Sequence, residues 1–229
     1  MPEENEIKQI KQLLAYCSIE QRYEIFQLLR QEFQIHSIEK ELNISAEIIL
    51  EAISRASDLT LRGIKGVVAE AAFELYVVDK LDNWDNVLLD GNYAYDFLLR
   101  DNIGPVRIQV KMQRQKEHRP MMANEAYRYL PSSMYVVETQ RTRGGRKNGE
   151  NTRPYKFGEF DIIAVSMRPS TNNWSDFMYS VESWLLPHPE LPNQLLKFQP
   201  VAKISNDVWT DDFRECINWF RSGEVKRII

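Results

Sequence analysis

Three polar residues with a regular spacing suggest metal-dependent chemistry: Asp96 in "YAYDFLLRD", and Gln109 and Lys111 in "VRIQVKM". Residues two apart on a strand share a face, so Gln109 and Lys111 point the same way, and a hairpin through "DNIGP" would bring Asp96 beside them. Asp supplies a hard oxygen ligand for Mg²⁺, the amide oxygen of Gln can complete the coordination, and Lys can position a water and stabilise developing negative charge. The spacing therefore predicts the parts of a metal-dependent phosphodiesterase.

A carboxylate from a preceding helix can complete this site. Apolar residues recur at helical spacing in "RGIKGVVAEAAFELYVVDK", residues 62–80. They form one predicted core stripe of Ile64, Val67, Val68, Ala71, Ala72 and Leu75. Glu70 lies on the flank of this stripe and can join the metal site directly or through a water. Glu74, one turn further along, could take its place.

These positions resemble the PD-(D/E)xK nucleases, the superfamily of many type II restriction endonucleases. The resemblance covers about residues 62–166, with Glu70 on the helix, Asp96 near a strand end and "QVK" in the (D/E)-x-Lys position. It implies Mg²⁺ held by Asp96, Gln109 and Glu70, Lys111 as the residue that positions the water, and a product with a 5′-phosphate. Two positions depart from the family pattern: Tyr95 stands in place of Pro, and Gln109 replaces the acidic ligand, as in the Q-x-K variant of Mrr-like members.

The elements needed to position these residues follow from the apolar pattern. Short strand-like segments at 84–90, 93–101 and 106–114 are separated by "GN" and "NIGP", which predicts successive antiparallel strands. A short helix is expected near 121–130, buried central strands at 133–141 and 160–167, edge strands after 177, and a closing amphipathic helix. The predicted fold is α/β (α+β), a restriction-endonuclease-like mixed central β-sheet flanked by helices.

The first sixty residues predict a separate helical subdomain, residues 1–60, preceding a nuclease core at 61–229. Apolar residues three and four apart favour helices over 6–17 and 20–33, and Ser45 could cap a helix that begins near Ala46. The pair around "IEKELNISAEIILEAI" is compatible with a helix-turn-helix. It is equally compatible with helices that brace the core or mediate dimerisation, since Glu47 and Glu51 would repel phosphate.

Two central segments are strongly basic although the whole chain carries a net charge of −4. The first continues the metal-binding strand and offers phosphate contacts at Arg114, Lys116 and Arg119. His118 could add another, but we favour a plain surface histidine. The second is a long insertion between predicted strands, which we expect to enter a DNA groove and to be mobile without DNA. Its DNA-binding candidates are Arg141, Arg143, Arg146, Lys147, Asn148 and Arg153.

Composition limits the remaining choices. A hydrophobic content of 43% supports one sizeable core. Cys17 and Cys216 match no metal-binding or redox spacing, which suits a reducing cytoplasm. The acidic start is unlike a signal peptide, and the sequence has no run of apolar residues long enough for a membrane span. A cytoplasmic protein with no membrane partner is expected.

The sequence thus predicts a Mg²⁺-dependent type II restriction endonuclease that acts on double-stranded DNA. One site cuts one strand, so cutting a palindrome predicts a homodimer. One alternative is a repair, junction-resolving or modification-dependent nuclease of the same superfamily. Another is a non-catalytic DNA-binding regulator that uses the N-terminal helices.

Overall fold

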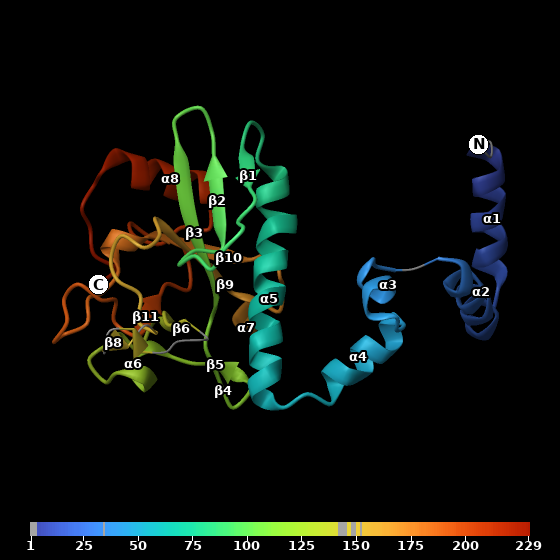
Figure 1. Cartoon of the computed structure of the whole chain (residues 1–229), viewed down its shortest axis with the longest axis horizontal. Helices are drawn as coiled ribbons and strands as arrows, with labels where there is room; N and C mark the ends of the chain where they lie inside the picture. The colour runs from blue at the N-terminus through green and yellow to red at the C-terminus, as the bar shows by residue number, and fades with distance from the viewer. Residues whose placement is uncertain (1–3, 34, 142–145, 148–149, 152) are drawn as a thin grey trace. The chain divides into compact units, whose positions relative to one another are not determined.

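A computed structural model of the chain describes residues 4–33, 35–141, 146–147, 150–151 and 153–229. The described chain divides into two compact units, Met1–Leu61 and Arg62–Ile229. The first is helical, and the second contains both helices and strands (Figure 1).

The first unit consists of four helices followed by the start of a fifth: α1 (Glu4–Tyr16), α2 (Ile19–Glu32), α3 (Ile38–Leu42) and α4 (Ala46–Ser54). α2 begins at a reciprocal cap, in which the Ser18 side chain accepts from Gln21 N and the Gln21 side chain accepts from Ser18 N. Glu39 is buried and joins these helices. Its carboxylate accepts hydrogen bonds from the amides of Ile35 and Ala46 and forms an ion pair with Arg30 at 2.8 Å. These contacts lower the pKa of Glu39 to about 2, the Arg30 hydrogen bond first among them.

The second unit is built on a five-stranded mixed sheet in the order β1-β2-β3-β9-β10. Its strands are antiparallel except for the central pair β3–β9, which is parallel. The bounds are β1 Asp85–Val87, β2 Phe97–Arg100, β3 Pro105–Met112, β9 Ile162–Ser166 and β10 Phe177–Val181. The predicted α+β class, a mixed sheet flanked by helices, is confirmed.

The described residues also form three two-stranded sheets: β6 (Tyr135–Glu138) with β11 (Phe198–Val201), β4 (Gln115–Lys116) with β5 (Arg119–Pro120), and β7 (Arg146–Lys147) with β8 (Glu150–Asn151). The remaining short elements are the 3₁₀ turns η1 (Val78–Lys80) and η2 (Glu182–Trp184) and the helices α6 (Ala123–Ala126) and α7 (Arg168–Thr171). The strand predicted at 133–141 forms as β6, in which Val136 and Val137 are fully buried. This strand pairs with β11 in a small sheet and is not part of the central sheet.

Two helices cover one face of the central sheet. They are α5 (Asp58–Tyr76), which runs beside the sheet in Figure 1, and α8 (Phe213–Ser222). The Phe73 ring of α5 packs against Phe97 of β2, Phe177 of β10 and Phe213 of α8, with ring centroids 5.2 to 5.5 Å apart. Such edge-on and tilted aromatic contacts fix the rotation of α5 on the sheet.

This rotation corrects the predicted core stripe of the helix. Ala69, Ala72 and Phe73 are its buried residues, whereas Val67 and Leu75 are exposed. Of the predicted stripe, Ala72 is buried, and the prediction is wrong for the exposed residues Val67, Val68, Ala71 and Leu75. The large Phe73 ring fills the aromatic pocket and so sets which face turns inward.

Candidate active site

The β2–β3 hairpin places the predicted site residues at one end of the sheet. Phe97 pairs with Ile108 across the hairpin, and Asp96 directly precedes β2, where its amide donates to Ile108 O at 2.8 Å. Gln109 and Lys111 lie on β3 on the same side as Asp96, because alternate residues of a strand share a face. The hairpin that the sequence predicts is thus present, and it brings these three residues together.

Asp96 is held in place by its neighbours on β3. Its Oδ2 accepts a short hydrogen bond from Gln109 Nε2 and a second from the Val110 amide at 2.8 Å. Gln109 is buried and also donates to Val110 O at 3.1 Å. In this arrangement Gln109 orients the Asp96 carboxylate, and its amide oxygen is the atom that could serve as a ligand.

Glu70 adds a second carboxylate from α5. Its pKa is raised to about 7, first by burial and then by the charge of Asp96, while the charge of Lys111 opposes this rise. The pKa of Asp96 is raised by burial, against the opposing effects of Lys111 and its two hydrogen bonds. Glu74 is exposed and accepts a hydrogen bond from Asn86 at 3.1 Å, whereas Glu70 is the helix carboxylate on which the charge of Asp96 acts.

Tyr155 is a site residue that the sequence did not reveal. Its ring is buried at 4% exposure, and the Lys111 ammonium lies 5.4 Å from the ring centroid. Tyr155 is distant from Lys111 in the chain, and a lone tyrosine in "RPYKF" carries no signal that distinguishes it from other core aromatics. Only the fold brings the two together.

The donor set fits a divalent cation with few protein ligands. Among the residues that the structure describes, no group of three or more His, Cys, Asp and Glu side chains could hold a metal ion, and the site offers two carboxylates and one amide. Mg²⁺ commonly binds through one or two carboxylates and keeps several waters. The charge of Asp96 raises the pKa of Glu70, and a bound cation would counter this repulsion.

The first basic segment is ion-paired. Arg119 donates two hydrogen bonds of 2.7 Å to Glu125, and Lys116 lies 3.3 Å from the same carboxylate. Arg114 pairs with Glu138 at 3.3 Å. These predicted phosphate contacts are exposed or half-exposed, and the sequence does not reveal their acidic partners.

The tip of this hairpin has an unusual backbone. Glu117 and His118 both have positive φ, 51° and 63°, the conformation of a two-residue turn that favours Asn and Gly. His118 is exposed at this tip.

Only part of the second basic segment is described. Arg141 pairs with Glu159 at 2.7 Å and its guanidinium lies 5.2 Å from the Tyr155 centroid, while Arg153 is exposed and donates to Arg141 O at 3.4 Å. Arg146 and Lys147 form β7, and their backbone pairs with β8. The predicted DNA contacts Arg143 and Asn148, and with them the predicted mobility, lie outside the described residues.

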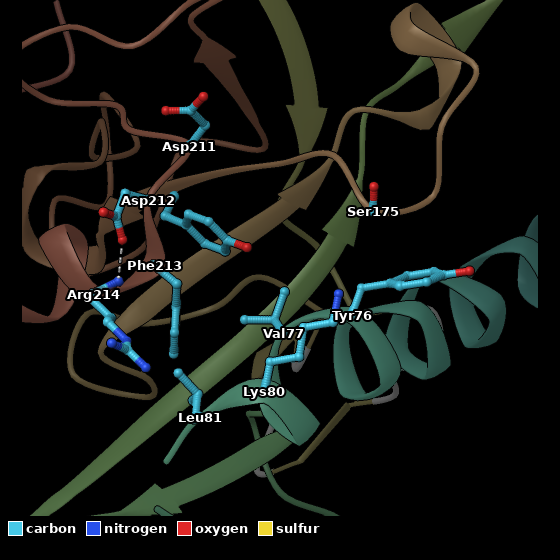
Figure 2. Close-up of a pocket in the computed structure, with 10 residues that line it drawn as sticks. Tyr76, Val77, Lys80, Leu81, Ser175, Asp211, Asp212, Phe213 and Arg214 are labelled. Carbon is cyan, nitrogen blue, oxygen red and sulfur yellow. Dashed lines mark hydrogen bonds between the residues drawn. The ribbon is translucent and has the colours of Figure 1, made fainter.

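A surface hollow of about 470 Å³ lies apart from these residues, between the end of α5 and the start of α8 (Figure 2). Lys80 and Arg214 line it together with Asp211 and Asp212. Asp212 caps α8 by accepting from Arg214 N at 2.8 Å, as Figure 2 shows. This hollow includes none of the predicted site residues.

Comparisons with known proteins add little. No protein-family model matches the chain, and no curated protein matches it. One solved structure, a bacterial homing endonuclease, I-Ssp6803I, is similar over 63% of this chain and 79% of that chain, with 20% identity and a TM-score of 0.35. A TM-score of this size does not establish a shared fold. No helix in the described part of the chain is long and apolar enough to cross a bilayer.

Proposed function

We propose that the protein is a Mg²⁺-dependent endonuclease that hydrolyses phosphodiester bonds in double-stranded DNA, as type II restriction enzymes do. The observation that supports it is the meeting of Glu70, Asp96 and Lys111 at the end of the β2–β3 hairpin, where the charges of Asp96 and Lys111 both act on Glu70. A half-buried pair of carboxyl groups with a neighbouring ammonium suits phosphoryl chemistry better than it suits a passive binding surface.

Each residue has a part in this proposal. Asp96 and Glu70 would hold the cation, and Gln109 fixes the carboxylate of Asp96. Lys111 would orient a water for in-line attack and stabilise the charge that develops on the phosphate oxygens. A bound Mg²⁺ would supply Lewis acidity and favour ionisation of the attacking water.

The basic hairpin and Arg141 would contact the DNA backbone next to this site. Lys116 and Arg119 are exposed at one end of β3, and an anionic phosphate can compete with Glu125 for them. We also propose a homodimer in the cytoplasm, because a single such site cuts one strand and a twofold axis would match a palindromic site.

The test is cleavage of mixed plasmid and phage DNA, unmodified, methylated or branched, with Mg²⁺ or with EDTA. We expect discrete Mg²⁺-dependent fragments from the intact protein. The Asp96→Ala and Lys111→Ala substitutions should each reduce the cleavage rate by roughly 10²-fold or more, since each removes a group that acts in the transition state. Glu70→Gln should show a large loss, whereas Glu74→Gln, one turn along the same helix, should cleave normally.

Two further measurements test the proposed dimer. For a dimer we expect a sedimentation mass of two chains and direct conversion of supercoiled plasmid to linear product. A single chain that accumulates nicked circles would contradict the dimer but not the nuclease. No cleavage of any substrate would overturn the nuclease, and metal-independent DNA binding that Asp96→Ala leaves unchanged would then identify a DNA-binding regulator.

A further inference from the structure

The Lys111 side chain reaches the site beside a fixed aromatic ring. Its ammonium lies 5.4 Å from the centroid of Tyr155, within the range of a cation–π contact, and it also interacts with the hydroxyl group of that tyrosine. Tyr155 is held from two sides, since its ring meets Phe160 edge-on at 5.5 Å and 87°, and its carbonyl accepts from Leu195 N at 2.9 Å. The ring therefore provides a rigid surface beside a flexible side chain.

A lysine at this position has competing choices. Its four-carbon stem can rotate, and the two carboxylates of the site attract its ammonium. Direct pairing with either carboxylate would neutralise a proposed metal ligand. The face of an aromatic ring attracts the ammonium without carrying a negative charge, so it can hold Lys111 near Asp96 while leaving both carboxylates for a cation.

We propose that Tyr155 is a positioning residue that holds Lys111 for the reaction. This inference rests on the proposed nuclease function and adds a residue to its machinery. Arg141 lies over the same ring at 5.2 Å, but Glu159 also holds it at 2.7 Å. Loss of the ring should consequently displace Lys111 more than Arg141.

The kinetic test compares Tyr155→Leu with Tyr155→Phe, which keeps the ring, and with Phe160→Leu. The last variant removes the neighbouring buried ring, over which none of the described cationic side chains lies. We expect Tyr155→Leu to lower the single-turnover cleavage rate roughly tenfold, the size of effect typical of a cation–π contact, with little change in DNA affinity. Tyr155→Phe, which removes the hydroxyl interaction with Lys111 but keeps the ring, should lose clearly less activity than Tyr155→Leu. In a Lys111→Ala background, Tyr155→Leu should cause no further loss, because the two residues act together.

A second measurement does not require cleavage. The ε-methylene protons of Lys111 should be shifted upfield by the Tyr155 ring in NMR spectra of protein with ¹³C-labelled lysines. Other lysines also lie over rings, such as Lys203 over Tyr135, so the Lys111 signal is assigned by its loss in Lys111→Arg. The upfield shift should disappear in Tyr155→Leu and persist in Phe160→Leu.

The outcomes separate the two proposals. An inactive protein in which the NMR shift behaves as expected would overturn the nuclease and leave the Lys111–Tyr155 contact in place. The positioning role would be overturned by an unshifted Lys111 signal, by equal losses in Tyr155→Leu and Phe160→Leu, or by a Tyr155→Phe variant as impaired as Tyr155→Leu. The last result would point to the hydroxyl group instead of the ring.

Discussion

Among the described residues of the second unit, Glu70 and Glu182 are the two carboxyl groups whose pKa is raised to about 7. Burial is the first cause for both. Only Glu70 also interacts with Asp96 and Lys111, whereas Glu182 interacts with Asp161 and Arg107 and accepts from Gly158 N at 2.7 Å. The pair offers a comparison between a buried carboxyl inside the proposed site and one outside it.

The raised pKa of Glu70 predicts a dependence of stability on pH. Its ordinary value is 4.5, so between about pH 4.5 and 7 the folded protein keeps a proton that the unfolded chain has lost, and stability from this group falls as the pH rises through that window. Glu70→Gln should therefore be more stable than the unmodified protein at about pH 8, on the order of 1 to 2 kcal/mol after allowance for partial solvent exposure, and similar to it near pH 4.5. Urea unfolding without metal at both pH values measures this.

Glu182→Gln is the matched control for the test of whether Glu70 binds the metal ion. It should show the same direction of pH effect, yet Mg²⁺ should still protect it from unfolding at about pH 8. In Glu70→Gln this protection should be weaker, because a proposed ligand has lost its charge. Equal protection of both variants would mean that Glu70 does not hold the cation.

At the scale of elements, the β4–β5 hairpin and α6 form one electrostatic unit. Glu125 of α6 accepts from Arg119 and Lys116 of the hairpin and from Met122 N, and these contacts, with Arg119 first, hold its pKa well below the usual range. The hairpin therefore presents two cations that share a single carboxylate when no other anion is near.

This pairing predicts that Glu125 restrains DNA binding. Glu125→Gln should bind DNA several-fold more tightly at low salt, roughly three- to tenfold, because two cations become available to phosphate. Fluorescence anisotropy over a range of salt concentrations measures it, with Glu190→Gln, an exposed carboxylate elsewhere, as the control for net charge. If both variants bind alike, Lys116 and Arg119 do not contact the backbone.

Local patterns in the sequence predict much of the site. The β2–β3 hairpin follows from alternation around "DNIGP", and its register brings Asp96 to Gln109 as expected. The acidic partners Glu125, Glu138 and Glu159 and the ring of Tyr155 are not predictable in this way, since hydrophobic periodicity does not show which polar or aromatic side chains the fold brings together. The partner sheet of β6 is hidden for a related reason: an apolar run looks alike in a sheet of two strands or five.

At the scale of the whole molecule, the sequence predicts a boundary after residue 60, and the structure divides into the units Met1–Leu61 and Arg62–Ile229. Helix α5 begins at Asp58, in the last residues of the first unit, and carries Glu70 twelve residues further on. Helical periodicity in the sequence predicts this helix. Its rotation depends on Phe73 and the aromatic residues of the sheet, which no local pattern identifies.

The parallel pairing of β3 with β9 has a consequence for the order in which the chain folds. β2 and β3 are joined by a short turn, whereas the connection from β3 to β9 contains β4 to β8 and α6. Closing the longer connection costs conformational entropy before its contacts form, so Asp96, Gln109 and Lys111 can meet early, while Tyr155 and β9 join them late. Pulsed hydrogen exchange during refolding should protect amides of β2 before those of β9, and simultaneous protection would contradict this order. The metal ligands would then be assembled before the ring that we propose makes Lys111 effective.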